Sequence, residues 1–396
     1  HPDRLAAFQR FRSDRGVPLA RFAAFNVLRR LYTRPWWEWP AEWRRPDDAR
    51  IAALRAGEQG EAMEAIEFAQ WCAHEQLFAC GELAAELGQP LGLYLDLAVG
   101  VRPDGFDAWN EQDAISHRLS VGAPPDLLNT AGQNWGLAGF SAGGLDRRAF
   151  EPFREMLRAA MRYAGAVRID HALGLKRLYL IPHGFAADKG VYVRMPLEAL
   201  LAVLAEESRA HRCIVIGEDL GTVPEGFRER LAAWGVWLYR VMMFERDHTG
   251  SFYDIGHYPP DTLVTFGTHD LATYKGWSSG HDIVLKQGFG IDPGESIEAR
   301  TAAVTKVAEL LRRHEIDQCD IFAAIAFLAR TRSRILAIMI EDLLNVIDQP
   351  NIPGTIDEHP NWRRKLPVPI EQFASAIDMA RLRQATGSRD VIRGSA

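Results

Sequence analysis

The stretch Ala166-Val167-Arg168-Ile169-Asp170-His171 decides the fold class of this chain, because a short apolar run ends there in charged residues. The pattern recurs twice: residues 213–216 precede Gly217-Glu218-Asp219, and residues 263–266 precede Gly267-Thr268-His269-Asp270. Short runs rich in branched apolar residues are typical of buried parallel strands. An acidic residue just after such a strand lies at the C-terminal mouth of a parallel barrel, where catalytic groups gather. The three stretches therefore predict an α/β fold with carboxylates at the strand ends.

The same rhythm of strand and helix continues over most of the chain. Apolar patterns predict further strands near residues 91–95, 236–243 and 334–340, and helices near 146–164, 196–210, 224–233, 296–313 and 319–330. Alternating strands and helices form a parallel sheet with helices packed outside it. The count is six strands, whereas a closed barrel of this class needs about eight. Either the count misses two strands, or the chain begins after them.

Two regions depart from this rhythm. Residues 1–50 and 61–88 have helical patterns, whereas residues 100–144 show no regular pattern. A connection of that length is generally functional. The predicted domains are a helical segment, residues 1–90, packed on a catalytic barrel, residues 91–396. The barrel would carry a long substrate-binding insertion at about 100–144.

Net charge and cysteine usage exclude several classes of protein. The formal net charge of −6 argues against nucleic acid or an anionic membrane as the main partner. The four cysteines form no CxxC pair, and no histidine cluster has the spacing of zinc ligands. So few cysteines in 396 residues favour a reducing compartment, and no apolar stretch reaches the ~18 residues that span a membrane. We therefore expect a cytoplasmic protein without a metal site.

Asp170 is the candidate nucleophile. Arg168 lies two positions earlier on the same strand, so both side chains project to one face. A guanidinium beside a carboxylate keeps it ionised, and an ionised carboxylate aimed at an anomeric carbon can form a glycosyl-enzyme. Several acids at strand ends, with Arg and His beside them, thus indicate acetal chemistry on sugars. The alternative is a purely structural Arg168–Asp170 ion pair.

Glu218 is the candidate proton donor. A carboxyl group that gives up a proton must first be protonated, which burial or a neighbouring negative charge achieves. The alternative for Glu218 is to help cap the helix that starts after Gly221-Thr222-Val223-Pro224-Glu225. Asp219 points away from Glu218, because successive strand residues face opposite sides, and is predicted to be structural. Asp270 would bond sugar hydroxyls and help to distort the ring, with His269 as a second partner.

Two features leave alternatives open. Asp96 follows the apolar run at residues 91–95 and is equally a catalytic acid or a member of a structural ion pair.

Aromatic residues make up 10% of the chain and include 11 Trp. Flat aromatic faces stack on sugar rings, but a large core uses the same residues, so sugar binding and core packing are weighed evenly.

Taken together, the motifs resemble those of glycoside hydrolase family 77, the 4-alpha-glucanotransferases also called amylomaltases or disproportionating enzymes. The resemblance covers nearly the whole chain and includes, besides the three acidic stretches, Trp36-Trp37-Glu38-Trp39-Pro40, Leu93-Tyr94-Leu95-Asp96-Leu97-Ala98-Val99-Gly100, Gly132-Gln133-Asn134-Trp135-Gly136, Asn351-Ile352-Pro353-Gly354-Thr355 and Glu358-His359-Pro360-Asn361-Trp362-Arg363-Arg364. It implies a (β/α)8 TIM-type barrel with helical insertions and no cofactor or metal. Relatives have sequence upstream of His1, so we expect an N-terminally truncated chain that lacks the first one or two barrel strands.

The resemblance also implies a role for each matching residue. Asp170 is similar to the family's nucleophile, Glu218 to its acid/base and Asp270 to the residue that stabilises the transition state. The residues implied to bind substrate are Arg168, His171, His269, Asp104, Gln133, Trp135 and Asn351.

The implied activity is transfer of an α-1,4-glucan segment to the 4-OH of another glucan or glucose by double displacement. One alternative is hydrolysis of α-glucans by the same residues, because transfer requires that water be kept from the glycosyl-enzyme. Another is a catalytically inactive glucan-binding fragment. An open barrel would need its edge strands covered, which predicts self-association, a separate N-terminal piece, or the helices of residues 1–88 against the gap.

Overall fold

The chain forms two compact units in the computed structural model, which describes residues 2–125, 131–355, 357–387 and 389. The first unit comprises His1–Gly122 and Gly136–Val215, and the second comprises Ala123–Trp135 and Ile216–Ala396. The described residues form a parallel sheet of six strands in the order β1-β4-β7-β8-β9-β10. The boundary between the units falls within strand β7 (Ile214–Gly217).

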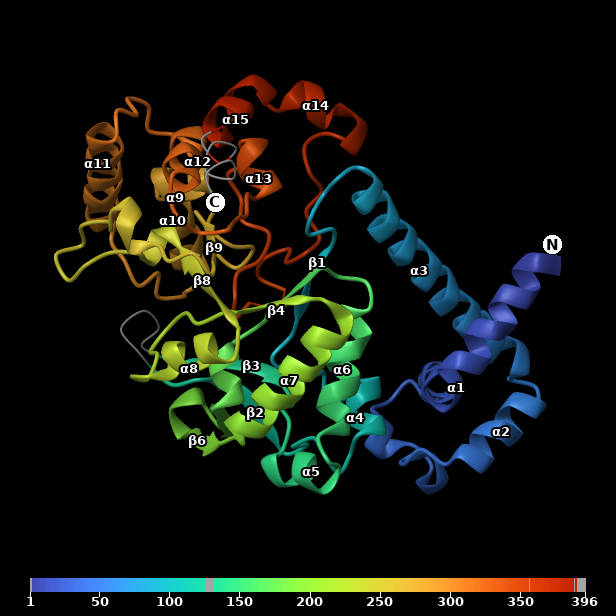
Figure 1. Cartoon of the computed structure of the whole chain (residues 1–396). Helices are drawn as coiled ribbons and strands as arrows, with labels where there is room; N and C mark the ends of the chain where they lie inside the picture. The colour runs from blue at the N-terminus through green and yellow to red at the C-terminus, as the bar shows by residue number, and fades with distance from the viewer. Residues whose placement is uncertain (1, 126–130, 356, 388, 390–396) are drawn as a thin grey trace. The chain divides into compact units, whose positions relative to one another are not determined.

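Three helices open the first unit and pack on one another, drawn in blue in Figure 1: α1 (Pro2–Leu31), α2 (Asp48–Ala56) and α3 (Gly60–Glu86). Helix α1 bends at Gly16, whose φ of 50° places it in the left-handed region, two residues before Pro18. Phe25, Trp39 and Trp109 are buried in the core that these helices share with the segment after α3. Most of the tryptophans near the N-terminus therefore serve packing.

Two strands of the first unit lie side by side in parallel, β1 (Tyr94–Leu97) and β4 (Ala166–Ile169). All four residues of β4 are buried, as expected for a strand of a covered parallel sheet. Gly165 precedes β4 and passes so close to the preceding chain that a Cβ there would lie 1.9 Å from the carbonyl oxygen of Leu91. Only glycine allows this approach. The amide of Ile214 donates to the Gly165 carbonyl oxygen at 2.9 Å, so β7 starts beside β4.

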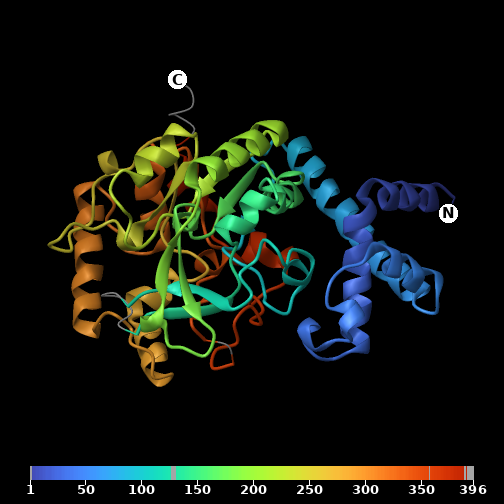
Figure 2. The ribbon, with the colours of Figure 1, turned by 90° about the horizontal axis from the view of Figure 1, so that it is seen from below.

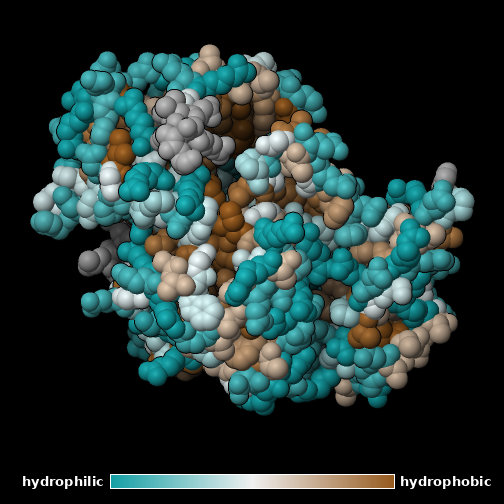
Figure 3. Space-filling model, viewed as in Figure 1, coloured by the Kyte–Doolittle hydropathy of each residue, from teal (hydrophilic) through white to brown (hydrophobic). Residues whose placement is uncertain are grey.

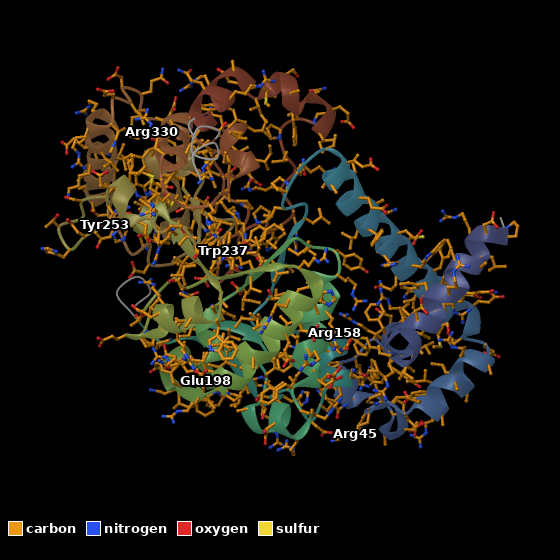
Figure 4. The ribbon with its side chains drawn as sticks, in the orientation of Figure 1. Arg45, Arg158, Glu198, Trp237, Tyr253 and Arg330 are labelled. Atoms are coloured by element: carbon orange, nitrogen blue, oxygen red, sulfur yellow. The ribbon has the colours of Figure 1, made fainter. Side chains whose placement is uncertain are left out.

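Helices α6 (Glu151–Met161) and α7 (Leu197–His211) pack against each other in the first unit. The buried carboxylate of Glu207 on α7 stabilises their contact by accepting hydrogen bonds from Arg154 at 2.8 Å and from Arg158 at 3.1 Å. Figure 4 labels Arg158 on α6. On the face shown in Figure 3, hydrophilic residues cover most of the outer surface, which is typical of helices that bury one side.

The segment at residues 100–144, predicted to lack regular structure, contains helices α4 (Phe106–Asn110) and α5 (Ala142–Arg147) and strands β2 (Leu119–Ala123) and β3 (Gln133–Leu137). These strands join β5 (Arg177–Pro182) and β6 (Val191–Arg194) in a second sheet of order β3-β2-β5-β6, whose β5–β6 pair is drawn in green in Figure 2. The prediction of an unstructured segment was wrong, because the partner of β2 lies about 60 residues later and leaves no local signal.

The second unit contains the strands β8 (Trp237–Val241), β9 (Thr262–Thr265) and β10 (Ile335–Leu336), which pair in parallel. Its helices are α8 (Phe227–Ala233), α9 (Tyr274–Ser279), α10 (His281–Gly288), α11 (Ile297–Arg313), α12 (Ile321–Ala329), α13 (Ile340–Leu343), α14 (Phe373–Ala376) and α15 (Met379–Thr386). Short 3-10 helices in the chain are η1 (Trp36–Glu38), η2 (Ala41–Trp43), η3 (Ala172–Leu175), η4 (Ala187–Lys189), η5 (Met242–Phe244), η6 (Ile255–His257) and η7 (Ile370–Gln372).

Each of the six predicted parallel strands overlaps a strand of the sheet in the described residues. Strand β1 covers Tyr94–Leu97 rather than 91–95, so Asp96 lies within the strand and not after it. Strand β10 covers only Ile335–Leu336 of the predicted 334–340. The helices predicted at 61–88, 196–210, 224–233, 296–313 and 319–330 correspond to α3, α7, α8, α11 and α12. The helical segment of residues 1–90 lies in the first unit together with β1 and β4, and its separation as a domain stays a prediction. Among the described helices, none has the length and apolarity to cross a membrane.

Replacing Gly165 by alanine should lower the free energy of unfolding by about 3 kcal/mol, because the new methyl group overlaps a backbone carbonyl that has no room to move. Urea unfolding of the two proteins measures this. The control is Gly81→Ala on α3, where the nearest atom to the new Cβ is 3.8 Å away. That change should raise stability by about 0.5–1 kcal/mol, since alanine favours helix. Equal stability of Gly165→Ala and the wild type would contradict the steric argument.

Candidate active site

The side chain of Arg168 on β4 holds two carboxylates of the first unit. The register of β1 and β4 sets Asp96 opposite Arg168, and Asp170 follows two residues later. Nη1 of Arg168 donates to both carboxylate oxygens of Asp96 at 2.8 Å, and its Nη2 lies 2.8 Å from Oδ1 of Asp170. The Arg168 side chain is 8% exposed, against 31% for Asp170. A buried guanidinium thus orients an accessible carboxylate at the end of β4.

This geometry bears on the open question about Asp96. Its carboxylate takes both hydrogen bonds from one nitrogen of Arg168, and its side chain is 42% exposed. The ion-pair role of Asp96 is therefore observed directly. Because Arg168 is shared, Asp96 also limits how far the guanidinium can move from Asp170.

His171 follows Asp170 and has a left-handed backbone, with φ of 47°. Burial lowers the pKa of the His171 imidazole, which favours its neutral form. Asp170 and His171 line the edge of an apolar cavity of about 60 Å³, whose other walls include Leu97, Val99 and Leu178. A neutral imidazole offers one donor and one acceptor, which suits a hydroxyl group as partner.

Glu218 and Asp219, which follow β7, have different surroundings within the second unit. Glu218 is 7% exposed, and one carboxylate oxygen accepts the amide of Leu220 at 2.6 Å. The next helix, α8, begins at Phe227 without a side-chain cap, so the capping alternative for Glu218 is not what the geometry shows. Asp219 is fully buried and accepts the amide of Tyr239 on β8 at 3.2 Å.

Two arginines complete the surroundings of Asp219. Arg228 donates to its Oδ2 at 2.5 Å, and a guanidinium nitrogen of Arg240 lies 3.6 Å from the same oxygen. The carboxylate therefore ties the turn after β7 to β8 and to α8. This agrees with the structural role predicted for Asp219, and it fixes the backbone on which Glu218 stands.

Asp270, beyond the end of β9, is held by side chains from two parts of the second unit. Nδ2 of Asn351 donates to Oδ1 of Asp270 at 2.6 Å, and Nε2 of His269 lies 3.2 Å from Oδ2. Gln349 fixes this arrangement, because its side-chain amide donates to the Asn351 carbonyl oxygen at 2.7 Å. The Asp270 side chain remains 33% exposed. An accessible carboxylate is again positioned by its neighbours.

The remaining predicted residues lie in other surroundings. Gln133 and Trp135 share strand β3, where the indole Nε1 of Trp135 donates to the side-chain oxygen of Gln133 at 3.0 Å. Asp104 precedes α4 and accepts two hydrogen bonds from Arg102 at 2.9 Å, with Arg29 3.9 Å away. The Arg102 hydrogen bonds lower the pKa of Asp104. Asp104 is therefore engaged in ion pairs with Arg102 and Arg29.

Sequence reasoning missed Asp342, which anchors the segment after β9. This carboxylate on α13 is 5% exposed and accepts the amide of Tyr274, the first residue of α9, at 2.6 Å. The hydroxyl of Thr273 donates to the carbonyl oxygen of Val346 at 2.7 Å. Burial raises the pKa of Asp342 to about 7. No local pattern signals these bonds, because they join residues about 70 positions apart.

Two groups of predicted residues are each held together within one unit. Arg168, Asp170 and His171 are adjacent in the first unit, and His269, Asp270 and Asn351 are together in the second. Within the part of the chain that the structure describes, no group of three or more His, Cys, Asp or Glu could hold a metal ion.

The fold and these strand-end carboxylates define a class: an α/β protein of the TIM-barrel type with acidic residues at the ends of its parallel strands. Residues 1–370 match the model of glycoside hydrolase family 77, described as 4-alpha-glucanotransferase. The chain belongs to this family.

Relatives and solved structures agree with this assignment. The 4-alpha-glucanotransferase of Mycobacterium tuberculosis (strain ATCC 25618 / H37Rv) is 34% identical over 404 residues, covering 98% of this chain and 56% of that protein. The Haemophilus influenzae 4-alpha-glucanotransferase is also 34% identical, covering 92% of this chain and 56% of that protein. The chain spans about half the length of the curated relatives it matches.

Two amylomaltase structures share the fold. The crystal structure of amylomaltase from Corynebacterium glutamicum superposes with a TM-score of 0.82 at 28% identity, covering 98% of this chain and 56% of that one. The amylomaltase from Streptococcus agalactiae, solved in complex with acarbose, gives a TM-score of 0.79 at 20% identity, covering 98% and 74%. The predicted TIM-type fold class is confirmed.

Asp342 should make stability depend on pH. Its pKa is about 7 in the folded chain and 3.8 when unperturbed, so the folded state favours the protonated acid. The contribution of Asp342 to the free energy of unfolding is fully present below about pH 4 and is lost as pH rises to about 7. The free energy of unfolding should fall over this range by an amount on the order of a few kcal/mol. In Asp342→Asn that loss should disappear, because the amide is neutral throughout and its oxygen can still accept from Tyr274.

Thermal unfolding of both proteins between pH 4 and 8 measures the effect. The control is Asp261→Asn, whose carboxylate pairs with Arg334 at the surface with more than half of each side chain exposed. The control should keep the pH dependence of the wild type. Parallel curves for Asp342→Asn and the wild type would assign the pH dependence to another group.

Proposed function

We propose that this chain carries the catalytic residues of a 4-alpha-glucanotransferase, which moves an α-1,4-glucan segment to the 4-OH of another glucan or of glucose. The observation that carries the proposal is the accessible Asp170 carboxylate held by the buried Arg168 at the end of β4, in a chain of this family. An oriented carboxylate at a strand end of a TIM-type fold is what a nucleophile for an anomeric carbon requires.

The reaction would proceed in two displacements. In the first, a carboxylate oxygen of Asp170 bonds to the anomeric carbon, and the bond to the glycosidic oxygen breaks as Glu218 gives that oxygen a proton. In the second, the 4-OH of the acceptor attacks the same carbon while Glu218 takes its proton and Asp170 leaves. The configuration at the anomeric carbon is retained, and no metal or cofactor takes part in the scheme.

The other predicted residues would bind and orient the glucan. Asp270 and His269 would bond hydroxyl groups of the distorted sugar, with Asn351 and its donor amide fixing the carboxylate. His171 would meet the same sugar as a neutral imidazole. Gln133, Trp135 and Asp104 would contact glucan further from the reacting bond. Asp104 would then accept a hydrogen bond from a sugar hydroxyl in addition to those from Arg102.

Three further expectations accompany this proposal. The order of the sheet gives β1 and β10 one described neighbour each. We expect a separate N-terminal piece, a second copy, or the helices of residues 1–88 to cover those edges. We also expect a cytoplasmic location and a helical domain at residues 1–90.

The change Asp170→Asn should abolish transfer and leave the fold intact, because the amide keeps the shape of the side chain but is no nucleophile. The measurement is the product pattern from maltotriose. Longer oligomers together with glucose indicate transfer, and only shorter sugars indicate hydrolysis by the same residues. Asp261→Asn is the matched control and should keep full turnover. Comparable turnover in Asp170→Asn would move the nucleophile elsewhere, and no turnover in the wild-type chain would favour a glucan-binding fragment.

A retaining mechanism also requires the carboxyl groups of Asp170 and Glu218 to be about 5–5.5 Å apart. A crystal structure of the chain with a bound malto-oligosaccharide would measure this separation. Carboxyl groups about 9 Å or more apart would instead fit an inverting mechanism and exclude the double displacement.

A further inference from the structure

The eleven tryptophans of the chain differ sharply in exposure, which separates core residues from candidates for sugar stacking. The two most accessible are Trp37, which is 44% exposed, and Trp362, which is 65% exposed. The fully buried ones include Trp39, Trp71 and Trp109. Five of the eleven indoles, those of Trp36, Trp39, Trp71, Trp109 and Trp277, are buried and have a packing role. Trp362 is the most accessible of the eleven.

Trp362 also has an unusual backbone. Its φ of 59° lies in the left-handed region, which a bulky residue rarely adopts and which costs about 1–3 kcal/mol. The surrounding loop enforces this conformation: the Trp362 amide donates to the carbonyl oxygen of Pro350 at 3.1 Å. The preceding Asn361 accepts the amide of Ile352 at 3.0 Å and donates to Thr355 at 2.8 Å. An exposed indole is thus held in a strained position by its neighbours.

The place where the indole is held is next to Asp270. The rings of Trp362 and His269 have centroids 5.2 Å apart and are inclined at 51°. His269 in turn lies 3.2 Å from the Asp270 carboxylate, on the side opposite to the oxygen that Asn351 bonds. The same loop therefore supplies the amide that fixes Asp270 and the aromatic face beside His269.

We infer that Trp362 is a glucan-stacking residue, whose indole binds the glucosyl ring adjacent to the one held by Asp270 and His269. The inference rests on the proposed function, which puts a glucan at Asp270. A flat apolar face with a polar edge complements the C–H face of a pyranose ring. A preformed, strained platform binds such a ring without a further ordering cost, which explains why the loop maintains an unfavourable backbone.

Two simpler explanations compete with this one. Trp362 could serve only to orient His269, but that contact leaves 65% of the residue exposed, more surface than packing requires. Trp37 could instead be the stacking residue. Its ring packs edge-on against Trp36, and half of the residues that line its groove are charged, among them Arg44, Arg45 and Glu42. The residues that line the groove of Trp37 include no carboxylate–histidine pair like that of Asp270 and His269.

The test uses the whole chain with Asp170→Asn, so that glucan binds without being consumed, and follows tryptophan fluorescence during titration with maltoheptaose and with maltotriose. Adding Trp362→Phe should remove most of the fluorescence change and weaken maltoheptaose binding about tenfold, which corresponds to 1.4 kcal/mol. The loss should be smaller for maltotriose. The matched control is Trp37→Phe, which should keep both the fluorescence change and the affinity.

A second variant, Trp362→Asn, separates binding from folding. Asparagine tolerates the left-handed region, so this variant should melt at a higher temperature than the parent and still bind maltoheptaose at least tenfold more weakly. A lower melting temperature with unchanged affinity would make Trp362 a packing residue and overturn the inference. Equal titrations for the parent and Trp362→Phe would overturn it while leaving the proposed function standing. Absence of any glucan binding in the parent would overturn both.

Discussion

A single buried guanidinium shared by two carboxylates organises the strand ends of the first unit. Arg168 stands on β4 with its side chain almost entirely buried, where an unpaired cation would be strongly unfavourable. The pairing of β1 with β4 supplies Asp96 directly opposite, and the continuation of β4 supplies Asp170. One constraint therefore links the strand register, the burial of Arg168 and the position of the candidate nucleophile. A shift of β1 by one residue would move Asp96 to the other face and leave Arg168 with less compensation.

In the second unit, buried side chains also fix the segments after the strands, but here they are carboxylates. Asp219 is a buried carboxylate compensated by Arg228, Arg240 and a backbone amide, and it fixes the turn that carries Glu218. Asp342 is a buried carboxylate that accepts a backbone amide and has no cation among its described partners, and burial raises its pKa. In each case a buried acid outside the proposed catalytic scheme fixes the backbone near an acid inside it: Asp219 stands next to Glu218, and Asp342 holds the segment that follows Asp270. Preorganised surroundings of this kind are what allow a carboxylate to act without rearranging during the reaction.

Family membership and local geometry support the functional proposal in different ways. The match over residues 1–370 identifies the chemistry that relatives perform, while the contacts of Asp170, Glu218 and Asp270 explain why those side chains can be held in place. Transfer rather than hydrolysis depends on whether an acceptor sugar reaches the glycosyl-enzyme before water does. Aromatic faces such as Trp362 bear on that competition, because they retain a sugar chain beside the reacting carbon.

The amino-acid sequence by itself determined the parallel strands and most of the helices, since apolar periodicity is local and each of the six strands overlaps its pattern, although β1 begins at Tyr94 rather than at residue 91. It also indicated the three strand-end acids, because a carboxylate after a buried run is visible in a few consecutive residues. Only the tertiary structure decided that Asp96 pairs with Arg168, that Asn351 and Asp342 support the segment after β9, and that residues 100–144 contain strands. It also decided that five of the eleven tryptophans are buried while Trp362 is exposed. These features join residues tens of positions apart, and burial and long-range pairing depend on how the whole chain packs rather than on any local pattern.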